Sequence, residues 1–116
     1  MSIFYKNQGF KQTDTAKATV LTCPVDGAII VKSIYCANND GSSAILVNMN
    51  FVDSSDSNTE YEFFRDDVAA KSQINASPEG LNLEAGDAIT VQAATGGSTI
   101  QGLISYALIN RENENG

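Results

Sequence analysis

Short runs in which apolar and polar side chains alternate recur along this chain, and they limit its fold more than any other feature. Residues 44–52, 88–93 and 98–110 show the alternation most clearly. A strand that buries one face and exposes the other requires this period of two. Turn-forming residues, such as those at 39–42 and 84–87, separate the runs. About seven or eight short strands at spacings of about 8–12 residues predict an all-β fold, a single antiparallel β-sandwich of jelly-roll type.

Residues 28–38 predict a strand with apolar side chains on both faces. The faces hold different side chains, with Ile30, Ile34 and Cys36 on one and Ile29, Val31 and Tyr35 on the other. A strand covered on both sides lies in the centre of a sandwich, or beneath an arm or a subunit contact.

The two cysteines, Cys23 and Cys36, lie on either side of a predicted hairpin. Asp-Gly at 26–27 between two β-branched runs is a strong hairpin signal, which would pair residues 19–23 with 28–38. In that hairpin the cysteines lie about 20 Å apart at ~3.3 Å per residue, beyond the ~7 Å Cα limit for a disulfide. We therefore expect two free, buried thiols that act as small apolar side chains, as suits a reducing cytosol.

The first 17 residues follow neither the period of a strand nor that of a helix. They mix polar residues with the apolar anchors Ile3, Phe4, Tyr5 and Phe10. We expect residues 1–17 to form an extended N-terminal arm that lies against its own domain or a neighbour; an ordinary first strand followed by a loop fits equally well. Residues 18–110 then form the sandwich domain, and residues 111–116 a polar C-terminal tail.

The middle of the chain is the most ambiguous region. Residues 60–63 alternate and predict that Tyr61 and Phe63 are buried. Residues 65–72 fit a two-turn helix, because Asp66 and Asp67 would lie near its N-terminus and Lys71 near its C-terminus. A crossing loop fits this segment almost as well.

Composition excludes several classes of function. Fourteen acidic against seven basic residues give a net charge of −7, the wrong sign for binding nucleic acid or an anionic membrane surface. No apolar run approaches the ~20 residues of a membrane-spanning helix. The chain has no histidine, so Ser-His-Asp catalysis, imidazole bases and His-containing zinc sites are excluded.

The remaining candidate site is an acidic cluster between residues 53 and 67. It contains Asp53, Asp56, Glu60, Glu62, Asp66 and Asp67. Carboxylates in a polar loop suit calcium, but the spacing follows no EF-hand pattern, and a solvated negative edge is the more economical interpretation. A hydrolase that uses a carboxylate pair is disfavoured by the lack of tryptophan for substrate stacking.

Four segments together resemble a family of small β-sandwich structural proteins of tailed bacteriophages. They are Val20-Leu21-Thr22-Cys23-Pro24-Val25-Asp26-Gly27, Ile30-Val31-Lys32-Ser33-Ile34-Tyr35-Cys36-Ala37-Asn38, Leu83-Glu84-Ala85-Gly86-Asp87-Ala88-Ile89-Thr90-Val91-Gln92-Ala93 and Ile104-Ser105-Tyr106-Ala107-Leu108-Ile109. Their order is similar to the family's: a strand, a Pro-containing turn, a second strand, a Leu-Glu-Ala-Gly-Asp turn and a closing strand.

The resemblance implies a virion component without catalytic residues, cofactor or metal, assembled in the bacterial host cytoplasm. We expect a capsid decoration (cement) protein that binds the major capsid protein or other virion proteins and forms a homo-oligomer. The alternative is a neck, tail or fibre-knob subunit that binds a host receptor or glycan through residues 38–42, 53–58 and 95–98. The expected interface residues are the arm residues Ile3, Phe4, Tyr5 and Phe10, together with Ile29, Val31 and Tyr35.

Overall fold

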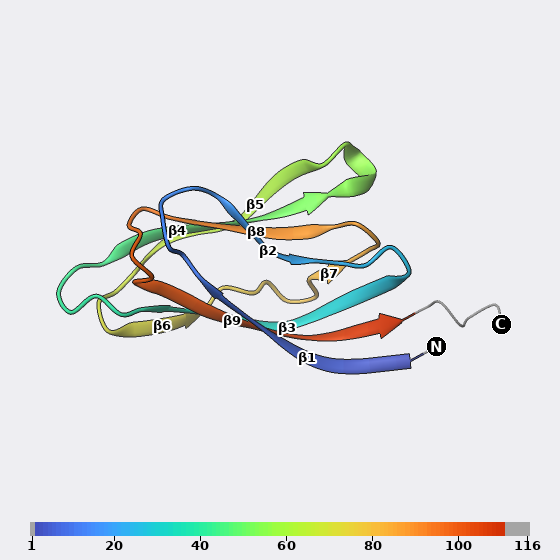
Figure 1. Cartoon of the computed structure of the whole chain (residues 1–116), viewed down its shortest axis with the longest axis horizontal. Helices are drawn as coiled ribbons and strands as arrows, with labels where there is room; N and C mark the ends of the chain where they lie inside the picture. Colours follow the sequence, from blue (N-terminus) through green and yellow to red (C-terminus); the bar gives the residue numbers. More distant parts are fainter. Residues whose placement is uncertain (1, 111–116) are drawn as a thin grey trace.

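Nine strands in two antiparallel sheets make up residues 2–110, the part of the chain that the computed structural model describes (Figure 1). Sheet A has the order β1-β9-β3-β6, with β7 also paired to β3. Its strands are β1 (Ser2–Lys11), β9 (Ile100–Asn110), β3 (Gly27–Asn38), β6 (Ser72–Asn75) and β7 (Asn82–Leu83). Sheet B has the order β2-β8-β4-β5, made of β2 (Ala18–Thr22), β8 (Ala88–Ala93), β4 (Ile45–Asp53) and β5 (Thr59–Val68). The predicted all-β sandwich is confirmed.

The core lies between the two sheets and is built by the predicted alternation. The fully buried side chains include Ile29 and Ile34 from β3, Ile104 from β9, Val47 and Met49 from β4, and Ile89 and Val91 from β8. Burying one such side chain contributes about 1.5–3 kcal/mol. Within residues 2–110, no helix is long and apolar enough to cross a membrane.

The hairpin predicted at residues 26–27 is wrong. β2 pairs with β8 in sheet B, whereas β3 pairs with β9 in sheet A, so the turn carries the chain from one sheet to the other. The Gly27 N–H donates to the Pro24 carbonyl at 3.1 Å, and a side chain at Gly27 would meet the Ile109 carbonyl. The sequence correctly predicts a turn at residues 26–27. It does not determine whether the two flanking strands pair in one sheet or lie in different sheets on either side of the core.

Both cysteines are free and buried, as expected, although the hairpin geometry behind that expectation is wrong. Burial raises the pKa of Cys36 to about 11. Burial also raises the pKa of Cys23, with further contributions from the negative charges of Asp87 and Asp26. Neither thiol is therefore placed to react at neutral pH.

The faces predicted for residues 28–38 need correction. The register between β3 and β9 shifts between Val31 and Ser33, and such a bulge moves the alternation by one residue. Ile29, Val31, Ile34 and Cys36 consequently all face the core, while Ile30 and Tyr35 are exposed. The strand does carry apolar side chains on both faces, but their distribution differs from the predicted one.

Residues 65–72 form no helix, and the predicted crossing loop is confined to residues 69–71, which carry the chain from sheet B to sheet A. Residues 65–68 continue β5, a turn follows, and β6 begins at Ser72. Tyr61 is 49% exposed, so its predicted burial is wrong, whereas Phe63 packs against the core. β5 is one of the two edge strands of sheet B, and sheet A offers only the short β6 opposite it.

Residues 2–11, at the start of the predicted arm, pair with β9 from Ser2 opposite Asn110 to Lys11 opposite Gln101. Of the two alternatives for the N-terminal segment, the structure has the first strand followed by a loop. This strand forms one edge of sheet A. The predicted tail at residues 111–116 lies outside the described residues.

Candidate assembly surface

The pairing in sheet A arranges side chains in rows across its outer face. Residues directly opposite each other in an antiparallel pair point to the same side of the sheet. Tyr5 on β1 lies opposite Ala107 on β9, which in turn lies opposite Ile30 on β3. In a second row Leu103 lies opposite Tyr35. These side chains point away from sheet B: on β9 and β3 the residues that alternate with them belong to the core, and Tyr5 points the same way because it lies opposite Ala107.

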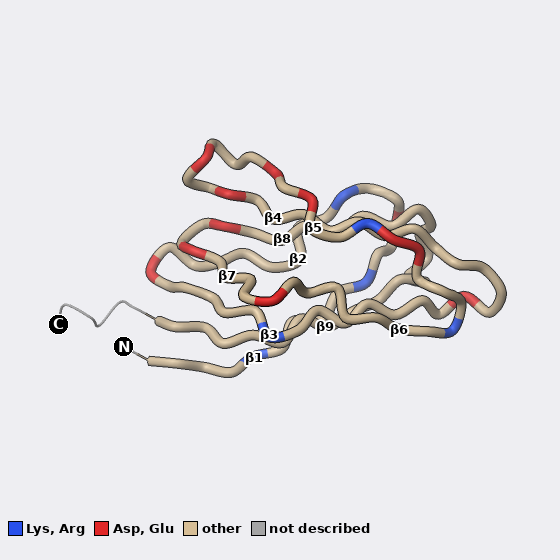
Figure 2. Tube along the Cα trace, turned by 180° about the vertical axis from the view of Figure 1, so that it is seen from behind, with Lys and Arg blue, Asp and Glu red and all other residues tan. Residues whose placement is uncertain are grey.

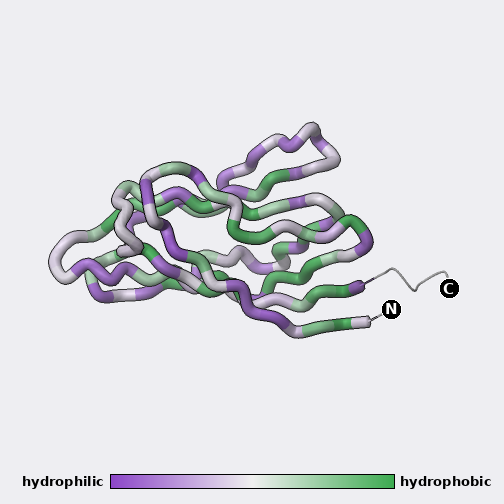
Figure 3. The backbone as a smooth tube through the Cα atoms, viewed as in Figure 1, coloured by the Kyte–Doolittle hydropathy of each residue, from purple (hydrophilic) through white to green (hydrophobic). Residues whose placement is uncertain are grey.

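This outer face carries five of the nine large hydrophobic side chains that are exposed within the described residues. They are Ile3 at 51%, Tyr5 at 77%, Ile30 at 45%, Tyr35 at 45% and Leu103 at 41% exposure. We call these five side chains the apolar face. Figure 3 shows the hydrophobic residues at the N-terminal end of β1 and beside them on β9 and β3. A polar row lies between the Tyr5–Ile30 row and the Leu103–Tyr35 row: Asn7 and Ser33 lie opposite Ser105, whose hydroxyl donates to Asn7 Oδ1 at 2.6 Å. Exposed apolar side chains on one face of a sheet are candidates for an interaction surface.

One cation lies within the apolar face. Lys32 occupies the bulge of β3, and its Nζ lies over the Tyr5 ring, 5.2 Å from the ring centroid. A cation–π contact at an exposed site contributes about 0.5–1 kcal/mol. It fixes the aromatic ring of β1 against the middle of the sheet, and so orders the most exposed member of the apolar face.

Charge is distributed unevenly between the two sheets. The strands of sheet A contain three lysines, Lys6, Lys11 and Lys32, and no aspartate or glutamate. Among residues 2–110 of this chain, whose net charge is −7, the side-chain carboxylates are therefore confined to sheet B and the loops. Figure 2 shows the acidic residues around β5, the β4–β5 turn and the loops, with sheet A free of them. The strands that carry the apolar face are thus free of carboxylates.

The outer face of sheet B is polar by contrast. Asn50 donates to the Thr90 hydroxyl at 3.2 Å, and that hydroxyl donates to Glu60 at 3.3 Å. Glu60 also forms an ion pair with Lys17 at 3.0 Å. These groups satisfy one another at the surface of the sheet, so this face has little to gain from being covered by another protein. The outer face of sheet A is the better candidate for an interface.

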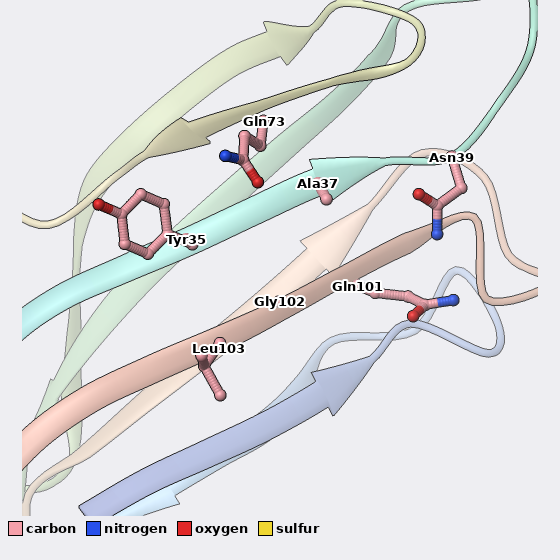
Figure 4. Close-up of a pocket in the computed structure, with 7 residues that line it drawn as sticks. All are labelled: Tyr35, Ala37, Asn39, Gln73, Gln101, Gly102 and Leu103. Atoms are coloured by element: carbon pink, nitrogen blue, oxygen red, sulfur yellow. The ribbon is translucent and has the colours of Figure 1, made fainter.

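A shallow hollow of about 430 Å³ lies at one end of the apolar face (Figure 4). Tyr35 and Leu103 contribute apolar surface, and Asn39, Gln73 and Gln101 contribute side-chain amides. The Asn39 N–H donates to the Thr99 carbonyl at 2.9 Å, which joins the β3–β4 loop to the β8–β9 loop at this end. The lining has no carboxylate, lysine, arginine or cysteine, and it offers an aromatic ring for stacking and amides for hydrogen bonding.

The acidic cluster does not converge on a cation site. Asp53 accepts hydrogen bonds from the N–H and hydroxyl of Ser55, and Asp56 accepts one from Tyr61 at 2.7 Å. Glu62 instead pairs with Arg65 at 2.8 Å, and the hydrogen bond from Arg65 lowers the pKa of Glu62. Among residues 2–110, no three acidic, histidine or cysteine side chains are grouped to hold a metal ion.

The structure separates the predicted interface residues into two groups. Ile3, Phe4, Tyr5 and Tyr35 are exposed. The other three, Phe10, Ile29 and Val31, are at most 8% exposed and belong to the core, so they are not surface residues. For Ile29 and Val31 the cause is the β3 bulge. Phe10 is buried because β1 is paired into sheet A and directs the Phe10 ring inward.

Two members of the apolar face escaped the sequence prediction. Ile30 was assigned to the same face as Ile34, and the bulge that separates them left no signal in the local pattern. Leu103 was overlooked although it lies out of phase with the core residues Ile100 and Ile104. Gln101 and Ser105 lie two residues before and after Leu103, and both were predicted to face outward. That spacing is the signal that places Leu103 on the outer face.

Known structures share this fold at low sequence identity. A chain of the acid-stable capsid of Helicobacter pylori bacteriophage KHP30 matches with a TM-score of 0.59 and 14% identity, over 94% of this chain and 88% of that one. The Drosophila NLP core, described for pentamer formation and histone binding, matches with a TM-score of 0.52 and 11% identity, over 94% and 99% of the two chains. A protein of the disulfide-linked pili of Bacillus endospore appendages matches with a TM-score of 0.51 and 13% identity, over 95% and 88%.

No protein-family model and no curated protein matches the sequence. At the identities above, the structural likeness shows the fold alone. It places the chain among β-sandwiches of the kind found in a phage capsid, a pilus and a pentameric core. The pilus is described as disulfide-linked, whereas both cysteines of this chain are buried.

Proposed function

We propose that this protein is a structural subunit of a tailed-phage virion, and most specifically a capsid decoration protein that binds the major capsid protein through the apolar face. The observation that carries the proposal is the coincidence of two properties on one side of sheet A. Five exposed apolar side chains gather there, and all carboxylates are absent from its strands.

The physical basis of this function is the burial of apolar surface. A stable interface removes about 800 Å² from water on each partner, and apolar area contributes about 25 cal/mol per Å² before ordering costs. A flat sheet with paired strands loses little conformational freedom when it is covered, which limits those costs. Repetition of the contact over a symmetric particle then multiplies the strength of each copy.

The similarity of the fold to a chain of a phage capsid supports this proposal at the level of architecture. The chemistry of the apolar face supports it further, because Tyr5, Ile30 and Leu103 contribute contact area and no nucleophile or general base. The buried thiols have no evident task beyond packing.

The experiment adds the purified protein to capsids built from the major capsid protein of the same genome and counts bound copies after sedimentation. Ile30→Lys with Leu103→Lys is expected to reduce binding at least tenfold while thermal unfolding stays unchanged, because both side chains are exposed. The matched control is Val25→Lys with Leu46→Lys, two exposed apolar residues outside sheet A. Unchanged occupancy of the first variant, or equal losses in both, would overturn the proposal.

A receptor-binding subunit of the neck, tail or fibre is the second candidate, and the hollow beside Tyr35 favours it. An exposed tyrosine next to three amide side chains suits a sugar, which stacks on the ring and bonds through its hydroxyls. Of the three loops expected to form such a site, residues 38–42 and 95–98 meet at this end. Residues 53–58 lie at the other end, where Ser54 contacts Asp87. Saturable binding on a glycan array that Tyr35→Ala abolishes would favour this candidate, and silence would favour decoration.

A further inference from the structure

Two of the strands at the edges of the sheets carry opposite charge, whereas the other edge strands, β2, β6 and β7, contain no charged residue. β1 is the last strand of sheet A and β5 is the last strand of sheet B, and each is ten residues long. Their outer backbone N–H and C=O groups have no neighbouring strand. Exposed edges of this length are templates for pairing with another chain.

The charge of β1 is entirely basic. The strand contains Lys6 and Lys11, both exposed, and no acidic residue. β2, beside it on the same side of the molecule, has no charged residue, and Asp14 in the connecting loop is the nearest acidic position in the sequence. The Asp14 carboxylate accepts the N–H of Ala16 within that loop.

The charge of β5 is mainly acidic. The strand contains Glu60, Glu62, Asp66 and Asp67 against Arg65 alone. Glu60 turns over sheet B to meet Lys17, and Glu62 binds Arg65. Asp66 and Asp67 are exposed and form no ion pair. Their side chains are therefore available to a cation from another molecule.

The two edges lie on opposite sides of the sandwich. The strand orders place β1 next to β2 on one side, and β5 next to β6 on the other, and contacts between these pairs confirm the arrangement. The side with β1 is nearer the viewer in Figure 1, and Figure 2 shows the acidic β5 side from behind. One molecule thus has a basic edge and an acidic edge on opposite sides of the sandwich. The two edges of the same molecule therefore cannot pair with each other.

We propose that copies of this chain assemble head to tail, with the β1 edge of one molecule pairing against the β5 edge of the next. Two β1 edges would bring lysines together, and two β5 edges would bring carboxylates together, so pairing of identical edges is opposed by charge. Only the β1–β5 combination places cations against anions. Each copy uses one edge for one neighbour and keeps its other edge free for the next neighbour. The contact can therefore repeat and form a closed ring or an open filament.

The pairing would bury aromatic side chains as well as backbone groups. Phe4 on β1 is 47% exposed and Tyr61 on β5 is 49% exposed, each on an edge strand that its own sandwich leaves partly uncovered. This interface uses the backbone edge of β1, whereas Ile3 and Tyr5 of the same strand direct their side chains out of the sheet into the apolar face. Edge pairing therefore needs no capsid partner. Purified protein alone is sufficient to test it.

The first measurement is sedimentation velocity of the wild-type protein over a concentration series. At low salt we expect the mass to rise with concentration beyond that of a monomer. At about 1 M salt, where the Debye length is about 3 Å, the assemblies should dissociate. A protein that stays monomeric at every concentration in low salt would overturn the proposal.

The decisive measurement is a charge exchange between the two edges. Lys6→Glu with Lys11→Glu makes both edges acidic, and Asp66→Lys with Asp67→Lys makes both edges basic, so each variant alone should remain monomeric. An equimolar mixture should assemble again, because acidic edges then meet basic ones. Asp26→Lys with Glu79→Lys changes the net charge as much as the β5 variant but alters only loops, and it should assemble like the wild type.

A monomeric mixture, or a control that behaves like the edge variants, would contradict pairing between these edges. Thermal unfolding of each variant establishes that the exposed substitutions leave the fold intact. A zero-length carbodiimide, which joins lysine to carboxylate only in direct contact, should link Lys6 or Lys11 to Asp66 or Asp67 in the assembled wild type. Cross-links confined to other pairs would also overturn the proposal.

Discussion

The ring of Phe10 on β1 lies against Gly102, the residue directly opposite it on β9. A methyl group added to Gly102 would overlap that ring and the backbone carbonyl of Tyr35. The Phe10 ring of β1 therefore fills the space that a side chain at Gly102 of β9 would occupy. This contact holds the C-terminal half of β1 to sheet A and closes the core at that edge.

Substitution at Gly102 should loosen β1. Gly102→Ala forces the Phe10 ring to move, and overpacking of this kind costs about 1–3 kcal/mol. Phe10→Ala removes the ring and should cost about 3–5 kcal/mol. Because the two residues share one space, the double variant should be less destabilised than the sum of the single ones. Urea unfolding of the four proteins measures this coupling, and strictly additive losses would contradict the packing described.

The limits of sequence analysis are visible at this contact. The alternation in residues 98–110 predicted which side chains of β9 face the core. It could not identify β1 as the partner of β9, because residues 1–17 lack a period of two. The pairing depends on a vacancy at Gly102 that only the folded sheet defines. Turn signals have the same limit: those at 26–27 fixed the position of a turn but not which sheets it joins.

Asp87 ties the β4–β5 turn to the start of β8. Its Oδ1 accepts hydrogen bonds from the Ser54 N–H and hydroxyl, both at 3.0 Å, and its Oδ2 accepts one from the Glu84 N–H at 2.8 Å. Asp87 is 3% exposed and its hydrogen bonds are partly buried. The Ser54 hydroxyl also donates to the Ala85 carbonyl at 2.9 Å, so loss of the carboxylate chiefly leaves the two N–H groups without an acceptor. Asp87→Ala should therefore cost about 2–4 kcal/mol, because each of the two partly buried N–H groups falls in the lower part of the range of about 1–3 kcal/mol for an unsatisfied donor.

Chemical denaturation measures that loss, with Glu79→Ala in the exposed loop before β7 as the control that should change stability by less than about 0.5 kcal/mol. Ser54→Ala removes one of the three donors. A double-mutant cycle with Asp87→Ala should therefore give a non-zero interaction energy between Ser54 and Asp87. A stability for Asp87→Ala equal to that of Glu79→Ala would show that the carboxylate does not hold these turns together.

The buried thiol of Cys36 should make stability decline at alkaline pH. Its pKa rises from 9.0 to about 11 because burial disfavours the thiolate. The folded-state pKa lies above the unfolded one, so the contribution is complete below pH 9 and is lost as the pH rises through 11. At pH 10.5 the loss amounts to about 2 kcal/mol.

The measurement compares wild type with Cys36→Ala at pH 8 and pH 10.5, because lysine and tyrosine titrate equally in both proteins. The free energy of unfolding should fall further in the wild type. Parallel profiles would contradict the expected effect of burial. Alkylation at pH 8 offers a second measure, since Cys36 should react only after unfolding.

The candidate surface was harder to predict than the fold. Tyr35 was recognised as an apolar side chain on the second face of its strand, and the exposure of Ile3 and Tyr5 agrees with the idea of contact residues in the N-terminal segment. Their grouping depends on β1, β9 and β3 lying side by side, which no local pattern contains. The sequence shows that these strands lack carboxylates. Only the pairing of the strands in one sheet shows that they form a continuous surface without carboxylates.

Adjacent residues of β3 should lose very different amounts of stability on truncation, because the bulge determines which of them faces the core. Ile29 is 1% exposed and Ile30 is 45% exposed. Ile29→Ala should cost about 2–5 kcal/mol through lost burial and a residual cavity, whereas Ile30→Ala should cost less than about 1 kcal/mol. Without the bulge, the alternation that starts from Ile34 would place Ile30 in the core and reverse the order. Urea unfolding of the two variants therefore tests the register of β3, and with it the placement of Ile30 on the apolar face.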